Sequence, residues 1–341
     1  MELKPVIASY SGESYQAMKG FLDRDALGVV GRVAQTPVTR AELEPSLCDE
    51  LIEMHVLREA DGFIRLDTAV FLEDDIRRVN LAMSQMAAAL SPRVMEAAAA
   101  MRHEHPVMTN FVVGMLGVGQ SLGHLLREAG VSFDWRSYGG KYARSKVDFD
   151  QVCEAHAELG EDLQTKTVLR GTRYTAVFIG PGGKAYPLRS GDAGGTIEYI
   201  RELNQFLTDA YAMLLTGELE NEALRLAAEQ AGLVRDGQPE SAVLTARQVD
   251  RFLPTIERVR SVTHSFYLDQ LQAIHQLLAS TASGRQGVDP AKMMMHLWRY
   301  MRRAIARELY TAGFLTDRAP ETGLITVFYE HDVEAVDALL R

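Results

Sequence analysis

The chain has 341 residues, of which 47% are hydrophobic, and its formal net charge is -10 at pH 7. This composition indicates a folded protein with enough apolar residues for two or three domains, and it excludes a low-complexity chain. The negative charge disfavours broad adhesion to phosphate, so any contact with nucleic acid has to come from a local basic patch.

The N-terminal segment MELKPVIASYSGESYQAM holds one lysine and no long apolar core, so it does not have the pattern of a signal peptide. The most apolar run, residues 107–126, is interrupted by polar residues, whereas a spanning helix needs about 20 predominantly apolar residues. The two cysteines, Cys48 and Cys153, form no C-x-x-C pair, which is typical of a reducing compartment. We therefore expect a cytoplasmic protein without membrane contact.

Helix signals dominate the sequence. Capping boxes, and capping residues that precede proline, predict helices that begin near residues 40, 92, 246 and 290. Apolar periodicity predicts further helices over residues 12–22, 24–35, 75–90, 148–160, 197–214, 219–231 and 255–281. The expected fold class is therefore mainly α with short β-hairpins.

Strand signals are few and short. They cover residues 63–72, 174–179, 184–188 and 323–329. The glycine-rich residues 180–183 between two of these runs predict a hairpin turn. The alternative, a phosphate-binding loop, lacks the Walker spacing and the following Ser or Thr.

Two distant stretches resemble each other. Residues 70–79 read VFLEDDIRRV and residues 327–336 read VFYEHDVEAV, and each follows a short helix and a turn-bearing stretch. Helix, turn, helix and hairpin is the order of a winged helix-turn-helix, which the sequence resembles at both ends. The resemblance implies winged-helix-like domains over residues 1–75 and 255–341, which flank a central helical domain with a β-hairpin over residues 76–254. The alternative is that two short matches arose by chance.

In the C-terminal copy the resemblance places two helices over residues 290–297 and 298–312 and a wing over residues 314–329. The second of these helices contains WRYMRRAIAREL, which carries four arginines that helical periodicity places opposite an apolar face. In this superfamily the second helix enters the major groove, where arginine contacts guanine edges or phosphates. The expected DNA contacts are Lys292, Trp298, Arg299, Arg302, Arg303, Arg307 and Arg318. The alternative is an ordinary arginine face that pairs with acids of the same chain.

In the N-terminal copy, the helix over residues 46–56 carries Asp49, Glu50 and Glu53 instead. Such a surface repels phosphate, so we expect this copy to contact protein or to support a homodimer.

Residues 111–137 resemble the first unit of a dinucleotide-binding domain. The resemblance implies that Gly114, Gly117 and Gly119 approach a pyrophosphate, that Asp134 binds a ribose and that Arg136 favours NADP over NAD. Leu116 stands where the second glycine of the pattern belongs, which puts the resemblance in doubt. The alternative is a buried helix whose glycines allow close packing.

His103 and His105 have a spacing that suits a ligand pair on a strand or loop, but no third ligand lies nearby in the sequence. His264 and His275 lie about three helical turns apart and cannot bind one ion directly, so no metal is expected. Three functions follow. The first is a transcriptional regulator that binds double-stranded DNA as a homodimer and takes a small effector or protein partner in its central domain. The second is a non-enzymatic subunit of a chromosome-associated complex, whose layout loosely resembles a kleisin. The third is an NAD(P)-dependent oxidoreductase.

Overall fold

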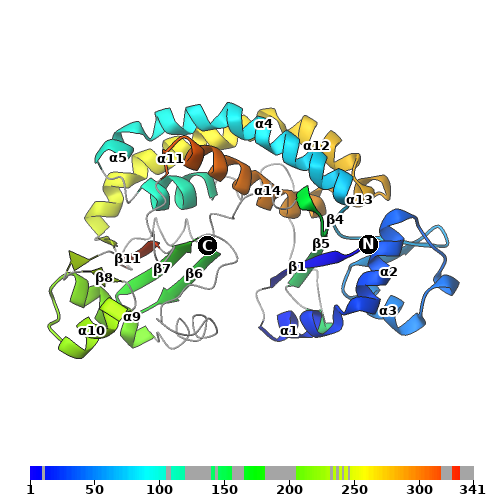
Figure 1. Ribbon diagram of the computed structural model, residues 1–341, viewed down its shortest axis with the longest axis horizontal. Helices are drawn as coiled ribbons and strands as arrows, with labels where there is room; N and C mark the ends of the chain where they lie inside the picture. The colour runs from blue at the N-terminus through cyan, green and yellow to red at the C-terminus, as the bar shows by residue number, and fades with distance from the viewer. Residues whose placement is uncertain are drawn as a thin grey trace. The chain divides into compact units, whose positions relative to one another are not determined.

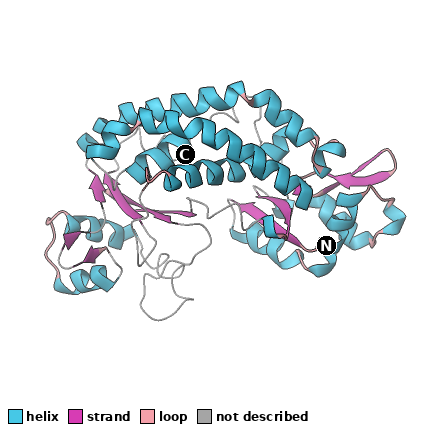
Figure 2. Cartoon of the chain, turned by 45° about the horizontal axis from the view of Figure 1, so that its top comes forward, coloured by secondary structure: helices cyan, strands magenta, loops and turns pink. Residues whose placement is uncertain are grey.

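The computed structural model is mainly helical with a few short sheets, as the sequence predicts (Figure 2). It describes residues 1–9, 12–104, 109–119, 140–142, 145–155, 165–180, 205–230, 233–235, 238–239, 242–244, 246–315 and 325–330. The contacts divide the chain into two compact units. Unit 1 comprises Met1–Ala87, Gly123–Gly160 and Phe266–Ala304, and unit 2 comprises Ala88–Leu122, Glu161–Ser265 and Ile305–Arg341.

The domain boundaries predicted after residues 75 and 254 do not coincide with these units. Both fall inside long helices, α4 (Glu73–Ala97) and α11 (Ala246–Asp269). Pro92 and Pro254 lie inside these helices, so the helix start expected near residue 92 is wrong. Proline marked a helix boundary in the sequence, but a proline is also tolerated within a long helix when neighbouring segments hold it.

Unit 1 begins with a strand and a set of short helices, which are followed by a hairpin and a long helix. Its elements are β1 (Leu3–Ser9), α1 (Gly12–Phe21), α2 (Arg24–Gln35), η1 (Arg40–Glu42), α3 (Pro45–Glu53), β2 (Leu57–Ala60), β3 (Phe63–Leu66), β4 (Val70–Phe71), the first part of α4, η3 (Gly140–Tyr142), β5 (Ser145–Gln151), α12 (Leu271–Ala279), α13 (Ala282–Arg285) and the first part of α14 (Pro290–Thr311). The capping box of Thr39 and Glu42 is confirmed at the start of η1.

Two small sheets organise unit 1. In the first, β5 lies between β1, with which it is antiparallel, and β4, with which it is parallel (Figure 1). The second is the β2–β3 hairpin, whose turn residues Asp61 and Gly62 have φ angles of +54° and +79°. Val38, in the loop after α2, forms a single antiparallel bridge with Ile64 of β3.

Unit 2 contains a larger sheet in the order β10-β11-β7-β6. Its elements are the end of α4, α5 (Ala99–Glu104), η2 (Asn110–Gly119), β6 (Thr165–Arg170), β7 (Tyr174–Gly180), α9 (Gln205–Leu215), α10 (Glu222–Gln230), β8 (Val234–Arg235), β9 (Gln238–Pro239), β10 (Ala242–Leu244), most of α11, the end of α14 and β11 (Ile325–Glu330). Part of its core is a cluster of buried side chains from β7, α9, α10 and β11, which includes Tyr174, Tyr211 and Phe328.

Three strands of the second sheet, β7, β10 and β11, repeat the topology of the first sheet, and β6 adds a fourth strand. Strand β11 is antiparallel to β7 and parallel to β10, just as β5 is antiparallel to β1 and parallel to β4. In both units, helices and a short hairpin separate the first strand from the one that precedes the long helix. The hydrogen bond from Val56 N to Leu51 O after α3 recurs from Leu233 N to Ala228 O after α10, at 2.9 Å in both places.

This repeat differs from the one predicted from the VF-x-E-x-D matches. Val70 and Phe71 lie in β4, whereas Val327 and Phe328 lie in β11, which holds the place of β5. The two matching motifs therefore occupy different positions in the fold. The helix predicted over residues 148–160 is also wrong, because residues up to Gln151 form β5.

The hairpin of strand β7 also differs from the prediction. The strand expected over residues 174–179 is confirmed, but its described hairpin partner is β6, which precedes it. Residues 181–190, which hold most of the predicted turn and the following strand, lie outside the described part of the chain. Asp209 of α9 holds the β6–β7 turn by accepting hydrogen bonds from the backbone nitrogens of Thr172, Arg173 and Tyr174.

Candidate functional site

The arginine-rich segment lies on a single helix, α14, which runs without interruption from Pro290 to Thr311. The break predicted between residues 297 and 298 is absent, because no glycine or proline separates the two halves. Residues 316–324 of the expected wing lie outside the described residues, and its last strand, β11, pairs with β7 and β10.

The arginines of α14 do not project freely into solvent as the sequence predicted. Arg299, Arg302, Arg303 and Arg307 are all half-buried, and Arg318 lies outside the described residues. The guanidinium of Arg302 lies over the indole ring of Trp298, at 4.7 Å from its centroid. Periodicity identified one apolar face correctly, but a helix covered on more than one side also buries part of its polar face.

Part of the positive charge of α14 faces β5, a strand with charged side chains in unit 1. Lys146, Asp148 and Asp150 alternate along β5, and each is no more than 5% exposed. Across from them, the N-terminal part of α14 presents a row of polar side chains at helical spacing, namely Lys292, His296, Arg299 and Tyr300. We call these seven residues the charged core.

Asp150 is the centre of the charged core. Its Oδ1 lies 2.6 Å from Nε2 of His296 and accepts a hydrogen bond of 2.7 Å from the hydroxyl of Tyr300. Arg299 Nη1 lies 3.9 Å from the second carboxylate oxygen. Burial raises the pKa of Asp150, but the charge and hydrogen bond of His296, the hydroxyl of Tyr300 and the charge of Arg299 outweigh it and hold the pKa at about 2.

Asp148 joins the charged core to the loop before β4. One carboxylate oxygen accepts hydrogen bonds from the hydroxyl of Thr68 at 2.7 Å and from Ala69 N at 3.2 Å. The other lies 2.8 Å from Lys146 Nζ, which also donates to the carbonyl of Lys292. Burial lowers the pKa of Lys146, although Asp148 opposes this effect.

A Tyr–Asp–His arrangement is chemically able to relay protons, but here no reactant has access to it. The side chains of His296 and Asp150 are 0% and 5% exposed. The ring of Phe71 covers His296 in an edge contact at 4.8 Å between centroids. Nδ1 of His296 has no hydrogen-bond partner, and it lies 3.9 Å from Asp148. The charged core therefore packs α14 against the sheet of unit 1.

Sequence reasoning missed most of the charged core. The alternation K-x-D-x-D in residues 146–150 has the period of a strand, but the stretch from residue 148 was predicted as helix. His296 and Tyr300 lie four residues apart on one helix face, which was a second signal for a polar contact.

The helix–hairpin module of the N-terminal region exposes an acidic face. Ser46, Asp49 and Glu53 are exposed on α3, and Arg40 is engaged by Asp49 and Glu59. The third predicted acid, Glu50, is held by Lys141 and the hydroxyl of Tyr142, which lowers its pKa.

The corresponding helix of unit 2, α10, has no free basic face either. Its one basic residue, Arg225, is bound by Glu222 at 2.6 Å and by Glu229 at 2.8 Å. Leu226 beside it is 48% exposed. Neither helix therefore presents the cationic surface that phosphate requires.

The predicted dinucleotide segment is helical where it is described. Residues 110–119 form η2, which overturns the strand expected at the start of the unit, and Asp134 and Arg136 lie outside the described residues. Gly114 and Gly117 are buried. A Cβ at Gly117 would lie 2.5 Å from Cγ1 of Val259 on α11, so this glycine permits close helix packing, as the alternative predicted. Gly119 ends η2.

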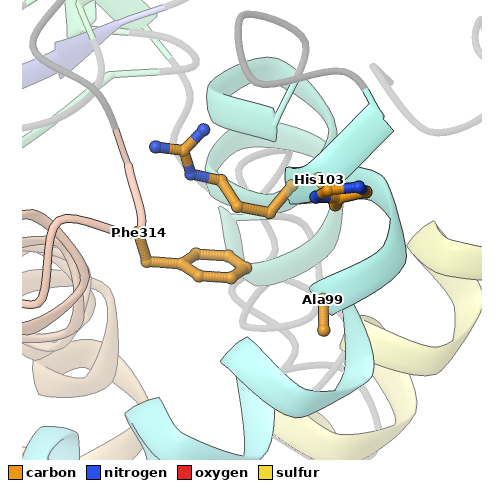
Figure 3. A pocket seen from close by; sticks show the side chains of 4 residues that line it. Ala99, His103 and Phe314 are labelled. Carbon is orange, nitrogen blue, oxygen red and sulfur yellow. The ribbon is translucent and has the colours of Figure 1, made fainter.

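An open pocket of about 490 Å³ lies in unit 2 and is lined by Ala99, Arg102, His103 and Phe314 (Figure 3). Arg102 donates a hydrogen bond of 3.3 Å to the carbonyl of Gly313, which fixes its position beside the pocket. The partner expected for His103, His105, lies outside the described residues.

Among the described residues, no cluster of three or more His, Cys, Asp or Glu side chains is arranged to hold a metal ion. No helix in this part of the chain has the length and apolar character needed to cross a membrane. No known protein family, no curated protein and no solved structure matches the chain.

Proposed function

We propose that the protein is a non-enzymatic interaction subunit that binds protein partners through two helix–hairpin modules. The first module comprises α2, η1, α3 and the β2–β3 hairpin, and the second comprises α9, α10 and the β8–β9 hairpin. The order of the first module, together with the bridge between Val38 and Ile64, supports a winged-helix arrangement at the N-terminus.

The observation that carries this proposal is the charge of α3, the helix that would enter the major groove in a DNA-binding winged helix. Its exposed face holds Asp49 and Glu53, and it lacks a basic residue. Such a face repels a phosphate backbone and complements a basic protein surface. A subunit of a chromosome-associated complex, with DNA bound by its partners, is the role that fits this charge best.

A DNA-binding regulator that uses α14 is the second candidate. It is supported by the stacking of Arg302 on Trp298, which holds one guanidinium in a fixed orientation on a helix with four arginines. The engagement of Lys292 by Asp67 at 2.6 Å and of Arg299 by Asp150 counts against it.

The two candidates differ in their affinity for DNA. We expect a fluorescent mixed-sequence duplex to show no saturable anisotropy change with the protein at low salt. Saturable binding that weakens with salt, and that is reduced in Arg302→Ala with Arg303→Ala, would favour the regulator instead.

The interaction role is tested by charge reversal on α3. Asp49→Lys with Glu53→Lys is expected to remove the partner proteins that cross-link to the wild-type chain in its native cells. The matched control is Glu257→Lys, which reverses an exposed charge on α11 in the other unit. Identical cross-linked partners in all three proteins would contradict the proposal.

A further inference from the structure

The two compact units draw on both halves of the chain. The first sheet is built from residues before 152 and the second from residues after 164. Yet residues 266–304, which follow β6, β7 and β10 of the second sheet, belong to unit 1, and residues 88–122, which follow β4, belong to unit 2. Each sheet is thus packed in one unit with helices that the other half of the chain supplies.

We infer that the charged face of β5 is the interaction surface that selects α14, a helix from the second half of the chain, as its partner. Because β1, β4 and β5 have the same arrangement as β7, β10 and β11, the arrangement of these three strands does not by itself determine which helices each sheet takes. The side chains of each sheet therefore have to determine which helices pack on it.

Strands β5 and β11, which hold corresponding places in the two sheets, differ in the side chains that select a helix. The last residue of β4, Phe71, pairs with Asp150, and the last residue of β10, Leu244, pairs with Tyr329. With the sheets aligned on these pairs, Asp148 corresponds to Val327 and Lys146 to Ile325. The first sheet therefore has a charged face where the second has apolar and aromatic residues.

Among the described residues, α14 supplies the side chains that pair with Asp150, whereas Thr68, Ala69 and Lys146 satisfy Asp148. Asp150 is contacted by His296, Arg299 and Tyr300. The side chain of Lys292 pairs with Asp67, and its backbone carbonyl accepts a hydrogen bond from Lys146. By contrast, η2, which the first half supplies to unit 2, reads NFVVGMLGVG and has no ionisable side chain. Packed on β5, η2 would leave the buried carboxylate of Asp150 without the side-chain partners that α14 supplies, which is strongly unfavourable.

Ser283 and Gln286, which precede α14 in the chain, form further hydrogen bonds to residues of unit 1. Gln286 donates from Nε2 to the carbonyl of Val33 at 2.6 Å and accepts from Leu66 N at 3.0 Å. Ser283 Oγ exchanges hydrogen bonds with the backbone of Val70. These contacts tie residues 283–286 to the hairpin and to β4 in unit 1.

Hydrogen exchange measured by mass spectrometry on the full chain tests the selection. Asp150→Asn keeps the shape of the side chain and removes its charge, and we expect amides in residues 290–304 to exchange at least about tenfold faster. The matched control is Tyr329→Phe at the corresponding position of β11, which is expected to leave residues 290–304 unchanged.

A second variant separates selection from simple stability. Lys146→Ile with Asp148→Val and Asp150→Tyr gives β5 the residues of β11, so we expect α14 to lose protection and the chain to elute as more than one species. Wild-type protection of residues 290–304 in both variants would overturn the inference. If the triple variant does not fold, Asp150→Asn decides alone: equal acceleration in unit 1 and unit 2 would show that the charge contributes only to general stability and would equally overturn it.

Discussion

Strands β5 and β11 hold the same place in two sheets that share a three-strand topology, but they are built from different side chains. Asp148 and Asp150 of β5 are buried among hydrogen bonds and ion pairs, whereas the corresponding residues of β11, Val327 and Tyr329, are buried without a carboxylate or ammonium group in either side chain. The comparison shows that this topology does not itself require charge in its core. A buried ion network is often no more stable than an apolar core of the same volume, so its value lies in the partner that it specifies.

The largest effect is expected when one side of the charged core is removed. Asp148→Ala leaves Lys146 buried without its carboxylate and should lower the free energy of unfolding by about 3–5 kcal/mol. Urea denaturation followed by circular dichroism measures this. The control is Lys146→Met with Asp148→Asn, which removes both charges but keeps an oxygen that accepts from Thr68 and Ala69, and it should cost far less. Equal losses in the two proteins would mean that the unpaired charge of Lys146 does not determine the effect.

A smaller effect is expected from acid. The pKa of Asp150 is about 2 in the folded chain, because His296, Tyr300 and Arg299 lower it more than burial raises it, whereas an unfolded aspartate titrates near 4. The folded pKa is the lower one, so its stabilisation is complete above about pH 4 and is lost as the pH falls toward 2. The amount is about 2 kcal/mol. Urea midpoints near pH 6 and near pH 3 should therefore differ less in Asp150→Asn than in the wild type. A parallel pH dependence in the two proteins would show that Asp150 does not contribute.

Local signals in the sequence predicted the elements whose structure depends on near neighbours. The capping box at Thr39, the start of α14 at Pro290 and the amphipathic α2 all follow from residues within one or two turns, and all three are confirmed. The class of the fold, mainly helical with short sheets, follows from the same signals.

Contacts between residues that lie far apart in the sequence could not be predicted from these local signals. Whether the polar face of α14 meets solvent or β5 depends on a strand more than a hundred residues away in sequence. The pairing of β11 with β7 likewise joins distant residues, so a local match to a wing did not predict it. The sequence predicted a repeat from two motifs that occupy different positions in the fold, and the structural repeat depends on the strand register, which composition and periodicity do not determine.

The smallest effect concerns the way in which unit 2 packs its own helices without a charged core. At Gly117 an added Cβ would lie 2.5 Å from Cγ1 of Val259, and overpacking of this kind costs about 1–3 kcal/mol. Alanine also favours the helix by about 1 kcal/mol over glycine, so Gly117→Ala should destabilise the chain by about 1 kcal/mol net. Gly28→Ala in α2 is the control, because nothing lies within 4 Å of an added Cβ there, and it should stabilise the chain by about as much. Opposite signs for the two substitutions in thermal unfolding would show that close contact at a glycine holds the helices of unit 2, where unit 1 uses charge. A gain of stability in both would mean that Gly117 is not needed for this packing.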